Sequence, residues 1–402
     1  MDIEDSAEGA AFRGEVRAFV SARRDELSIG RGAAPERVPD LRRAQALLHS
    51  AGLVGVTWPV EYGGRGGTPV QKVIVEQELD RAEVPRLIGW IGVGMCGPAI
   101  MAHGTEEQKR RYLTPMLNAD EVWCQLFSEP GAGSDLAALS TRAVRDGDGW
   151  RISGQKVWTT GAQWCDYGIL LARTDPSKPK HRGLTMFLLD MRAPGLTVRP
   201  LREMTGAAVF NEVFLDDVPV PDSARLGEID GGWAVALTVL MNERYSVGGD
   251  GTVYGAGPDA LTRAVADALP GLGTDRRAEI LQEYAACWIE GLACRMTGNR
   301  MLTALSEGRE PGPEGSAGKL ASSALLKRAA DLGLCLQGDD ALFGASAAGD
   351  GTWQGIATFA PGISLAGGTT EVMKNILGER VLGLPPEPRL DKAAAATGGK
   401  ER

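Results

Sequence analysis

The stretch TRAVRDGDGWRISGQKVWTT, residues 141–160, decides the fold, because it is the clearest hairpin pattern in the region after Glu121, where helical patterns give way to strand patterns. Its two halves are strand-like runs, and DGDG at residues 146–149 is the kind of turn that closes a β-hairpin. Four further short runs follow closely: YGILLART, LTMFLLDM, LTVRPL and NEVFLDDVPV. Because this spacing leaves no room for crossover helices, we expect residues 121–228 to form an antiparallel β domain.

Outward from the hairpin, both flanks have helical patterns. Before it, apolar residues recur every three or four positions in LRRAQALLHSAGL, PVQKVIVEQELDRAEV and GTEEQKRRYLTPML, the last with Thr105 as a candidate N-cap. After it, four more stretches suit a helical bundle: residues 232–247, 276–302, 316–337 and 371–383. We therefore expect an α+β chain with an N-terminal helical domain (1–120), the β domain, a C-terminal four-helix bundle (229–385) and a mobile tail (386–402).

Composition excludes several function classes. The 402 residues carry a formal net charge of -9, which argues against a general nucleic-acid binder. No apolar run approaches the roughly 20 residues of a membrane span, and MDIEDSAEGA lacks the pattern of a secretory leader. The six cysteines form no C-x-x-C pair and the three histidines have no nearby second ligand, so we expect buried thiols, no metal site and a cytoplasmic location.

SEPGAGSD, residues 128–135, is the most specific short motif. Two glycines in a polar loop can expose consecutive backbone N–H groups, and such a loop suits an anion such as a pyrophosphate. A tight turn between domains explains the same residues, and both interpretations stay open at this point.

GQKVWTTGA, residues 154–162, places Trp158 beside Thr159 and Thr160 at a strand end. A flat ring next to two hydroxyl groups suits a planar heterocycle that accepts and donates hydrogen bonds. A tryptophan in a β domain is also a common core residue, so this motif alone does not decide between the two.

LMNERYSVGG, residues 240–249, contains a carboxylate in an unusual place. On a helix, Glu243 falls on the apolar stripe formed by Ala236, Val239, Leu240 and Val247. A carboxylate on an apolar face is costly unless it is paired or takes part in chemistry, so Glu243 is either half of a buried ion pair or a functional group.

Several of these stretches, in this order, resemble the acyl-CoA dehydrogenase family. The resemblance covers residues from about 41 to 386 and is carried by AGLVGVTWPVEYGGRGGT, GTEEQKRRYL, SEPGAGSDLA, GQKVWTTGA, VFLDDVPVP, GGWAVA and GGTTEVMKNILGERVLGLP. It implies an FAD-dependent bacterial enzyme that removes two hydrogens from an acyl-CoA thioester, with electron-transfer flavoprotein as electron acceptor. It also implies a tetramer, built from one chain or from two related chains.

The resemblance further implies which residues form the site. Those expected to contact FAD are Gln125, Leu126, Phe127, Ser128, Gly133, Ser134, Trp158, Thr159, Thr160, Thr369, Thr370 and Glu371. Those expected to contact the acyl-CoA are Ser134, Asn242, Arg244, Gly367 and Gly368.

The catalytic base is implied by a departure from the commonest family pattern. That pattern has a glutamate immediately before GT, where this chain has Gly367, which cannot take a proton. Members resembling the isovaleryl and long-chain dehydrogenases carry the base in the earlier helix, immediately before an arginine. NER at residues 242–244 matches that arrangement and assigns the base to Glu243, while a backbone N–H at Gly367 can still polarise the thioester oxygen.

Two family stretches that help to hold FAD are missing. Residues 269–277, LPGLGTDRR, replace the usual R-x-x-F-G, and residues 336–344, LQGDDALFG, replace Q-x-x-G-G. Two alternatives stand beside the dehydrogenase. One is a flavin monooxygenase or N-hydroxylase on the same fold, and the other, suggested by Gly367 and these gaps, is a non-catalytic subunit that completes another chain's site.

Overall fold

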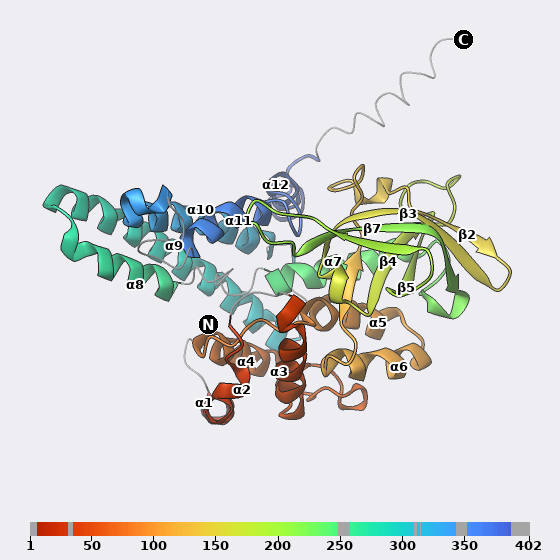
Figure 1. Cartoon of the computed structure of the whole chain (residues 1–402), viewed down its shortest axis with the longest axis horizontal. Helices are drawn as coiled ribbons and strands as arrows, with labels where there is room; N and C mark the ends of the chain where they lie inside the picture. Colours follow the sequence, from red (N-terminus) through yellow and green to blue (C-terminus); the bar gives the residue numbers. More distant parts are fainter. Residues whose placement is uncertain are drawn as a thin grey trace, which may run out of the picture. The chain divides into compact units, whose positions relative to one another are not determined.

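The computed structural model describes residues 6–30, 35–247, 258–308, 312–313, 315–342 and 352–386 (Figure 1). Backbone contacts divide the chain into two compact units. The first comprises Met1–Ser246 with Leu302–Arg309, and the second comprises Val247–Met301 with Glu310–Arg402. The tail expected to be mobile, residues 386–402, lies outside the described residues apart from its first position.

The N-terminal part of the first unit is helical, as the apolar spacing predicts. Its helices are α1 (Ala7–Ala22), α2 (Arg24–Leu27), α3 (Val38–Ser50), α4 (Pro69–Arg81), α5 (Gly97–His103) and α6 (Glu106–Leu117). Both α4 and α6 begin with a capping box, in which a threonine and the glutamine three residues later accept each other's backbone N–H groups. The predicted cap at Thr105 is therefore confirmed, with Gln108 as its partner.

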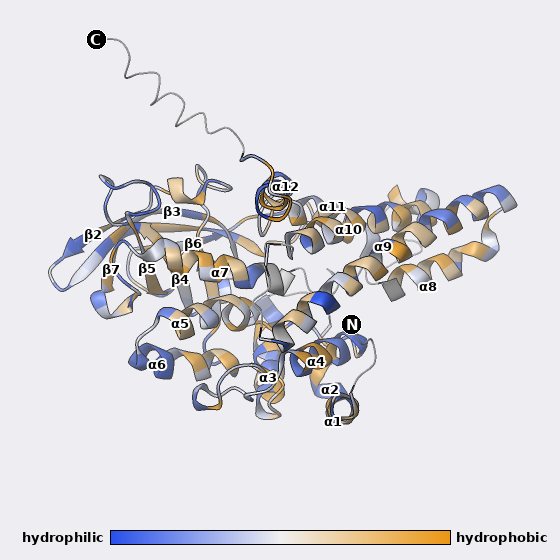
Figure 2. Cartoon of the chain, turned by 180° about the vertical axis from the view of Figure 1, so that it is seen from behind, coloured by the Kyte–Doolittle hydropathy of each residue, from blue (hydrophilic) through white to orange (hydrophobic). Residues whose placement is uncertain are grey.

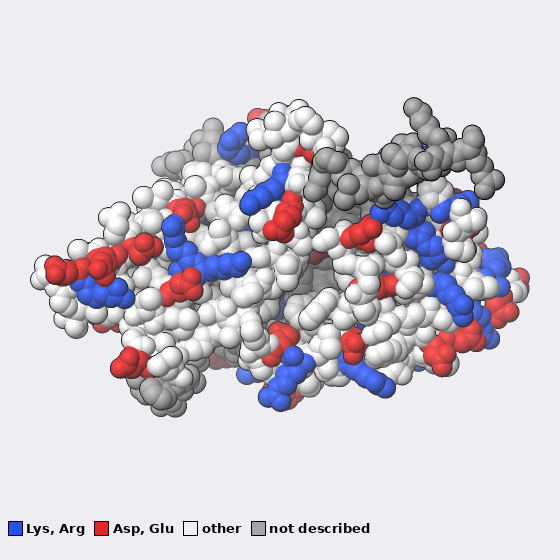
Figure 3. Space-filling view, turned by 90° about the horizontal axis from the view of Figure 1, so that it is seen from above, with Lys and Arg blue, Asp and Glu red and all other residues white. Residues whose placement is uncertain are grey.

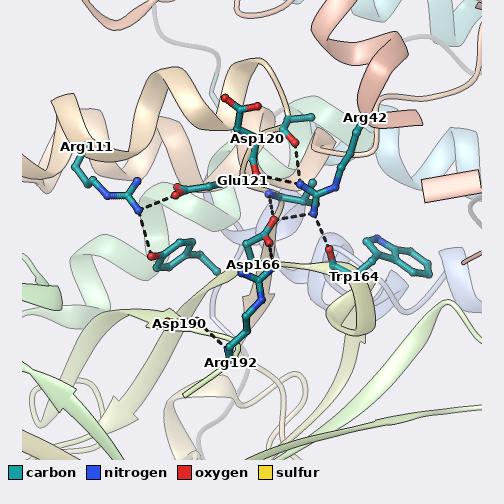
Figure 4. A network of polar contacts seen from close by, with 11 residues as sticks. Arg42, Arg111, Asp120, Glu121, Trp164, Asp166, Asp190 and Arg192 are labelled. Atoms are coloured by element: carbon teal, nitrogen blue, oxygen red, sulfur yellow. Dashed lines mark hydrogen bonds and ion pairs between the residues drawn. The ribbon is translucent and has the colours of Figure 1, made fainter. Parts of the chain in front are cut away.

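A buried carboxylate joins α3 to the sheet that follows. Asp166, which is 7% exposed, accepts hydrogen bonds from Arg42 at 2.7 Å and from Arg192 at 2.5 Å (Figure 4). Arg42 also donates to main-chain carbonyl oxygens, among them that of Trp164 at 3.2 Å. A buried carboxylate is stable only when its charge and its hydrogen-bonding capacity are satisfied, so this network fixes the position of α3 on the sheet.

The sheet occupies the middle of the chain. Its strands are β1 (Trp123–Leu126), β2 (Arg142–Asp146), β3 (Gly149–Thr160), β4 (Tyr167–Arg173), β5 (Leu184–Asp190), β6 (Leu196–Pro200), β7 (Phe210–Pro221) and β8 (Arg225–Leu226). They lie in the order β6-β7-β3-β2-β4-β5-β8, with β1 paired to β4. The hairpin predicted at residues 141–160 is confirmed, because β2 and β3 pair antiparallel with Asp146 opposite Gly149.

The sequence analysis expected an antiparallel sheet, but the observed sheet also contains parallel pairs. β1 pairs with β4 in parallel, with Trp123 opposite Tyr167, and β2 makes a short parallel contact with β4. A parallel pair needs a long connection, and here the β2–β3 hairpin lies between the two strands in sequence and takes the place of a crossover helix.

Helix α7 (Gly232–Val247) follows the sheet in the first unit. Its first residue lies directly against β5: a Cβ on Gly232 would be 2.7 Å from the Thr185 backbone, so only glycine allows this close approach. Val235, Ala236 and Val239 are buried, which places the apolar face of α7 on the protein interior.

The second unit is a set of helices. They are α8 (Pro258–Ala268), α9 (Thr274–Ser306), α10 (Gly315–Gln337), α11 (Thr352–Ile363) and α12 (Thr370–Ile376). Apolar and polar residues lie on different faces of α8 (Figure 2), and its buried residues pack with those of α10 and α11 in one core. The sequence analysis had named no helix at α8 or α11. None of the described helices is long and apolar enough to cross a membrane.

Candidate functional site

The end of β3 holds a tryptophan in a strained and exposed position. Trp158 has φ 59° and lies where the register between β3 and β7 shifts, between Lys156 and Thr159. Its side chain is 61% exposed and contacts the Phe210 ring edge-on, with centroids 5.9 Å apart. A left-handed backbone costs a bulky residue about 1–2 kcal/mol, and exposing an indole sacrifices burial as well. Such a combination is typical of a surface reserved for a flat ligand.

The two threonines after Trp158 point in different directions. Thr160 is half-buried, whereas Thr159 is 1% exposed and its carbonyl oxygen accepts from Asn211 Nδ2 at 3.0 Å. The Thr159 Oγ1 and Asn211 Oδ1 atoms are buried and have no hydrogen-bond partner among the described residues. Trp158 and Thr160 therefore have side-chain surface available, whereas Thr159 is interior.

The loop SEPGAGSD follows β1 and contains a tight turn. Glu129 and Ala132 exchange backbone hydrogen bonds of 3.1 and 3.0 Å, which makes the tight turn. Gly133 and Ser134 are exposed, and a Cβ built on Gly131 or Gly133 would meet nothing within 4 Å. The turn thus presents an open glycine backbone that a ligand can approach closely.

The strand that leads into this loop is largely interior. Leu126 and Phe127 are buried, and Gln125 and Ser128 are half-buried. Of these four side chains, only the two polar ones have surface available for a ligand.

A buried ion pair joins the loop to β3. Lys156 is fully buried, and its Nζ lies 2.8 Å from Glu129 Oε1 and 3.0 Å from the Phe127 carbonyl oxygen. The Val157 N–H donates to the Ser128 carbonyl oxygen at 2.9 Å. These contacts fix the loop of residues 128–135 beside Trp158, so the first unit brings the two motifs together. The sequence analysis missed this pair.

Both members of the pair are charged at neutral pH. Burial opposes ionisation of Glu129, but the Lys156 ammonium and hydrogen bonds from Lys156, Thr141 and Ser140 lower the pKa of this carboxyl to about 2. Burial lowers the pKa of Lys156 to about 8, against the attraction of Glu129. An internal charge pair with satisfied hydrogen bonds is a rigid support for the surface above it.

The predicted base lies on α7. Glu243 is half-buried and follows the buried Ala236 and Val239 on the helix at spacings of seven and four residues. Asn242 Nδ2 donates to the Thr238 carbonyl oxygen at 2.8 Å, one turn earlier. The backbone of Arg244 belongs to α7, but its side chain lies outside what the structure describes.

The glycine pair lies in the second unit, between α11 and α12. Gly367 has φ 66° and Gly368 has φ 99°, and a Cβ on Gly368 would be 2.4 Å from Met373 Cε. Thr369 caps α12 by accepting from the Val372 N–H at 3.3 Å. Thr370 is half-buried, and its N–H donates to the Ser364 carbonyl oxygen at 3.1 Å. Both glycines are therefore required by the backbone of this turn.

Glu371, in the first turn of α12, is exposed. Hydrogen bonds from its own backbone N–H and from Thr369 lower its pKa, and the nearby Lys374 acts in the same direction. A solvated carboxylate of lowered pKa is a weak proton acceptor, so this glutamate suits a polar contact better than a base.

The stretches that depart from the family pattern have local roles. Leu269–Gly271 forms a short turn between α8 and α9, and Arg277 Nη2 donates to the Leu269 carbonyl oxygen at 3.0 Å. Arg276 pairs with Glu279 at 2.8 Å. Gly338–Leu342 extends α10 by a short turn, and residues 343–344 lie outside the described residues.

No group of three or more His, Cys, Asp or Glu side chains that could hold a metal ion occurs in the described part of the chain. All six cysteines are free thiols, and four of them are buried. Cys294 is half-buried and Cys335 is exposed. The expectation of buried thiols is therefore wrong for Cys335, which lies near the end of α10 and is not covered by other described residues. On the face drawn in Figure 3, Lys and Arg side chains lie among Asp and Glu.

Family models for three consecutive domains match most of the chain. They are described as acyl-CoA dehydrogenase N-terminal domain (residues 6–120), middle domain (124–218) and C-terminal domain (230–382).

Two curated relatives come from Mycobacterium tuberculosis. The acyl-CoA dehydrogenase FadE34 is 37% identical over 95% of this chain, and the match spans 50% of FadE34. The acyl-CoA dehydrogenase IpdE1 is 34% identical, and the match covers 97% of this chain and all of IpdE1. The chain therefore spans half the length of one relative and the full length of the other.

Solved structures have the same fold. The Tcur3481–Tcur3483 steroid ACAD is similar with a TM-score of 0.81 and 30% identity, covering 96% of this chain and 100% of that one. The ChsE4–ChsE5 complex from Mycobacterium tuberculosis matches with a TM-score of 0.81 and 28% identity, over the same shares of the two chains.

Proposed function

The chain belongs to the acyl-CoA dehydrogenase family, and from this premise we propose that it converts an acyl-CoA thioester to the 2-enoyl thioester with FAD as cofactor. The observation that carries the proposal is the position of Glu243, a half-buried carboxylate on the apolar face of α7 in a chain whose residue 367 is glycine.

The residues of the first unit fit a flavin. An exposed indole at the end of β3 offers a flat apolar face, Thr160 adds a hydroxyl group beside it, and the open turn at Gly131 and Gly133 lets a phosphate approach the backbone. Bound there, the flavin would accept the hydride that leaves the β carbon. We propose that the cofactor contacts are those that the family resemblance implies, with surface available at Gln125, Ser128, Ser134, Thr369, Thr370 and Glu371.

The chain's own contribution to the reaction is proton transfer and its support. We propose that the Glu243 carboxylate takes the proton from the α carbon. The negative charge that develops on the thioester oxygen needs a positioned donor, and the Gly367 N–H is the proposed one. Asn242 and Arg244 are proposed to contact the acyl-CoA from α7, together with Ser134 of the glycine loop.

The proposed substrate class is a CoA thioester with a bulky, steroid-like acyl group. Support comes from the steroid ACAD, which is 30% identical over nearly the whole chain. Incubating the FAD-loaded protein without oxygen with straight-chain, branched and steroid side-chain acyl-CoAs, and following the flavin absorption, would identify the class that reduces it.

We also propose that the site is completed in an assembly with a second, related chain, and that electron-transfer flavoprotein takes the electrons. Support comes from the absent R-x-x-F-G and Q-x-x-G-G stretches and from relatives whose structures are complexes of two named chains. The absent stretches and Gly367 equally favour a second candidate, a non-catalytic subunit. The flavin absorption of this chain purified alone decides between them, because a colourless protein would support the second candidate.

Glu243→Gln tests the base. This change keeps the shape of the side chain but removes the proton acceptor, so flavin reduction by acyl-CoA should slow by about 100-fold or more while FAD stays bound. Glu228→Gln, at an exposed glutamate before α7, is the matched control and should reduce its flavin at the wild-type rate. Equal rates for Glu243→Gln and wild type would show that the base is another residue.

A further inference from the structure

A lysine is buried beneath the glycine pair of the second unit. Lys319 of α10 is 2% exposed, and its Nζ donates to the Gly368 carbonyl oxygen at 2.7 Å and to the Ser364 carbonyl oxygen at 3.4 Å. Burying an ammonium group is expensive, because it loses its hydration. This one is retained at a position where its hydrogen bonds reach both ends of the turn between α11 and α12.

The turn itself has little intrinsic reason to keep one conformation. Gly367 and Gly368 both have positive φ, and glycine has more backbone freedom than any other residue. The Thr370 N–H donates to the Ser364 carbonyl oxygen at 3.1 Å, the same oxygen that Lys319 approaches. Lys319 therefore supplies the long-range contacts that hold two flexible residues in place.

The donors of the turn are left available. The N–H groups of Gly367, Gly368 and Thr369 have no acceptor in the part of the chain that the structure describes. In a trans peptide the N–H points opposite to the C=O, so a Gly368 carbonyl held by Lys319 directs the Thr369 N–H away from the lysine. Preorganised N–H groups of this kind are what a developing oxyanion requires.

We propose that Lys319 is a positioning residue of the acyl-thioester site, because its buried ammonium holds the Ser364 and Gly368 carbonyls and so fixes the backbone of the glycine pair and of Thr369, whose N–H groups are left for the thioester oxygen. This inference rests on the proposed function. Lys319 acts through the backbone and touches no reacting atom.

The first test needs no ligand. In Lys319→Met the protected amides of the turn, those of Leu365, Ala366 and Thr370, should exchange hydrogen at least about tenfold faster than in the wild type, because a contact of about 1.5 kcal/mol or more is lost. The matched control is Lys327→Met, at an exposed lysine of the same helix, which should leave these rates unchanged. Unchanged exchange in Lys319→Met would overturn the inference.

The second test separates a positioned donor from a simple support of the fold. Octanoyl-CoA is a thioester, and S-octyl-CoA is the matching thioether, which lacks the carbonyl group. Cholyl-CoA and its thioether analogue form a second pair of this kind. The comparison uses whichever pair the wild type binds. Compared with the wild type, Lys319→Met should bind the thioester of that pair about tenfold more weakly and the thioether equally well. It should also reduce its flavin about 100-fold more slowly, because misplaced catalytic groups lose about that factor.

The outcomes of the two tests are distinct. A wild type that prefers thioesters, with a Lys319→Met variant that prefers them equally, overturns the role of Lys319 and leaves the proposed function intact. A wild type that binds none of the four compounds and is not reduced by acyl-CoA overturns the proposed function and the thioester role with it. If Lys319→Met does not fold, the same binding measurements are made on Lys319→Arg and Lys319→Gln. The arginine variant should keep more of the thioester preference than the glutamine variant. The reverse order would contradict the inference.

Discussion

Removing one member of the buried Lys156–Glu129 pair should destabilise the first unit strongly. Lys156→Met leaves the Glu129 carboxylate with hydrogen bonds from Ser140 and Thr141 but without its cation. Glu129→Gln leaves a buried ammonium without its carboxylate. Breaking a buried pair from one side typically costs about 3–5 kcal/mol. The double variant should cost less than the sum of the two single changes, because no uncompensated charge remains in it.

The pH dependence of stability gives an independent magnitude. The pKa of Glu129 is lowered from 4.5 to about 2, which at about 1.36 kcal/mol per pKa unit corresponds to about 3 kcal/mol of folding free energy. Since the folded state has the lower pKa, this contribution is fully present above pH 4.5 and is lost as the pH falls toward 2. Glu129→Gln should therefore flatten the loss of stability with acid in that range.

Urea unfolding followed by circular dichroism measures these effects on the wild type, both single variants and the double variant. The matched control is Lys72→Met, which removes an exposed pair with Glu76 (2.6 Å) and should change the unfolding free energy by less than about 1 kcal/mol. The reasoning is refuted if Lys156→Met costs no more than this control, or if the two single costs simply add in the double variant.

Three further outcomes are expected. Trp158→Ala should weaken FAD retention and shift the flavin absorption band, since its exposed indole is the proposed ring contact; an unchanged spectrum with unchanged retention would contradict that placement. Glu371→Gln should affect FAD retention more than the rate of flavin reduction, and the opposite result would move the base to Glu371. Light scattering should show a tetramer, with a related chain co-purifying if the assembly is mixed; an active, FAD-loaded monomer would contradict the assembly.

Local signals in the sequence predicted much of the fold. The β2–β3 hairpin follows from a four-residue turn, and the start of α6 follows from Thr105 with Gln108. These features depend on residues close together in the chain, which is why a pattern reveals them. By contrast, α11 contains Gly355, Pro361 and Gly362, which locally favour a loop, and it is helical because Trp353 and its other apolar residues pack into the core of the second unit.

The supports of the candidate site were not predictable in the same way. Lys156 and Lys319 look like ordinary surface lysines in the sequence, since nothing next to them indicates burial. Their partners lie 27 and 49 residues away, at Glu129 and Gly368, so only the folded chain reveals what they hold. Thr159 illustrates a related limit, because the register shift beside Trp158 breaks the alternation from which its direction would be read.

The parallel pairing of β1 with β4 has a consequence for the order in which the chain folds. β1 continues directly into the loop of residues 128–135, and its partner strand comes only after the whole β2–β3 hairpin has been synthesised. Contacts of long sequence separation form late, because their loop-closure entropy must be overcome first, whereas a hairpin closes within microseconds. We therefore expect the hairpin to form early and the glycine loop to reach its final shape only when β4 docks. A nascent chain that ends before Tyr167 should accordingly be unable to retain FAD.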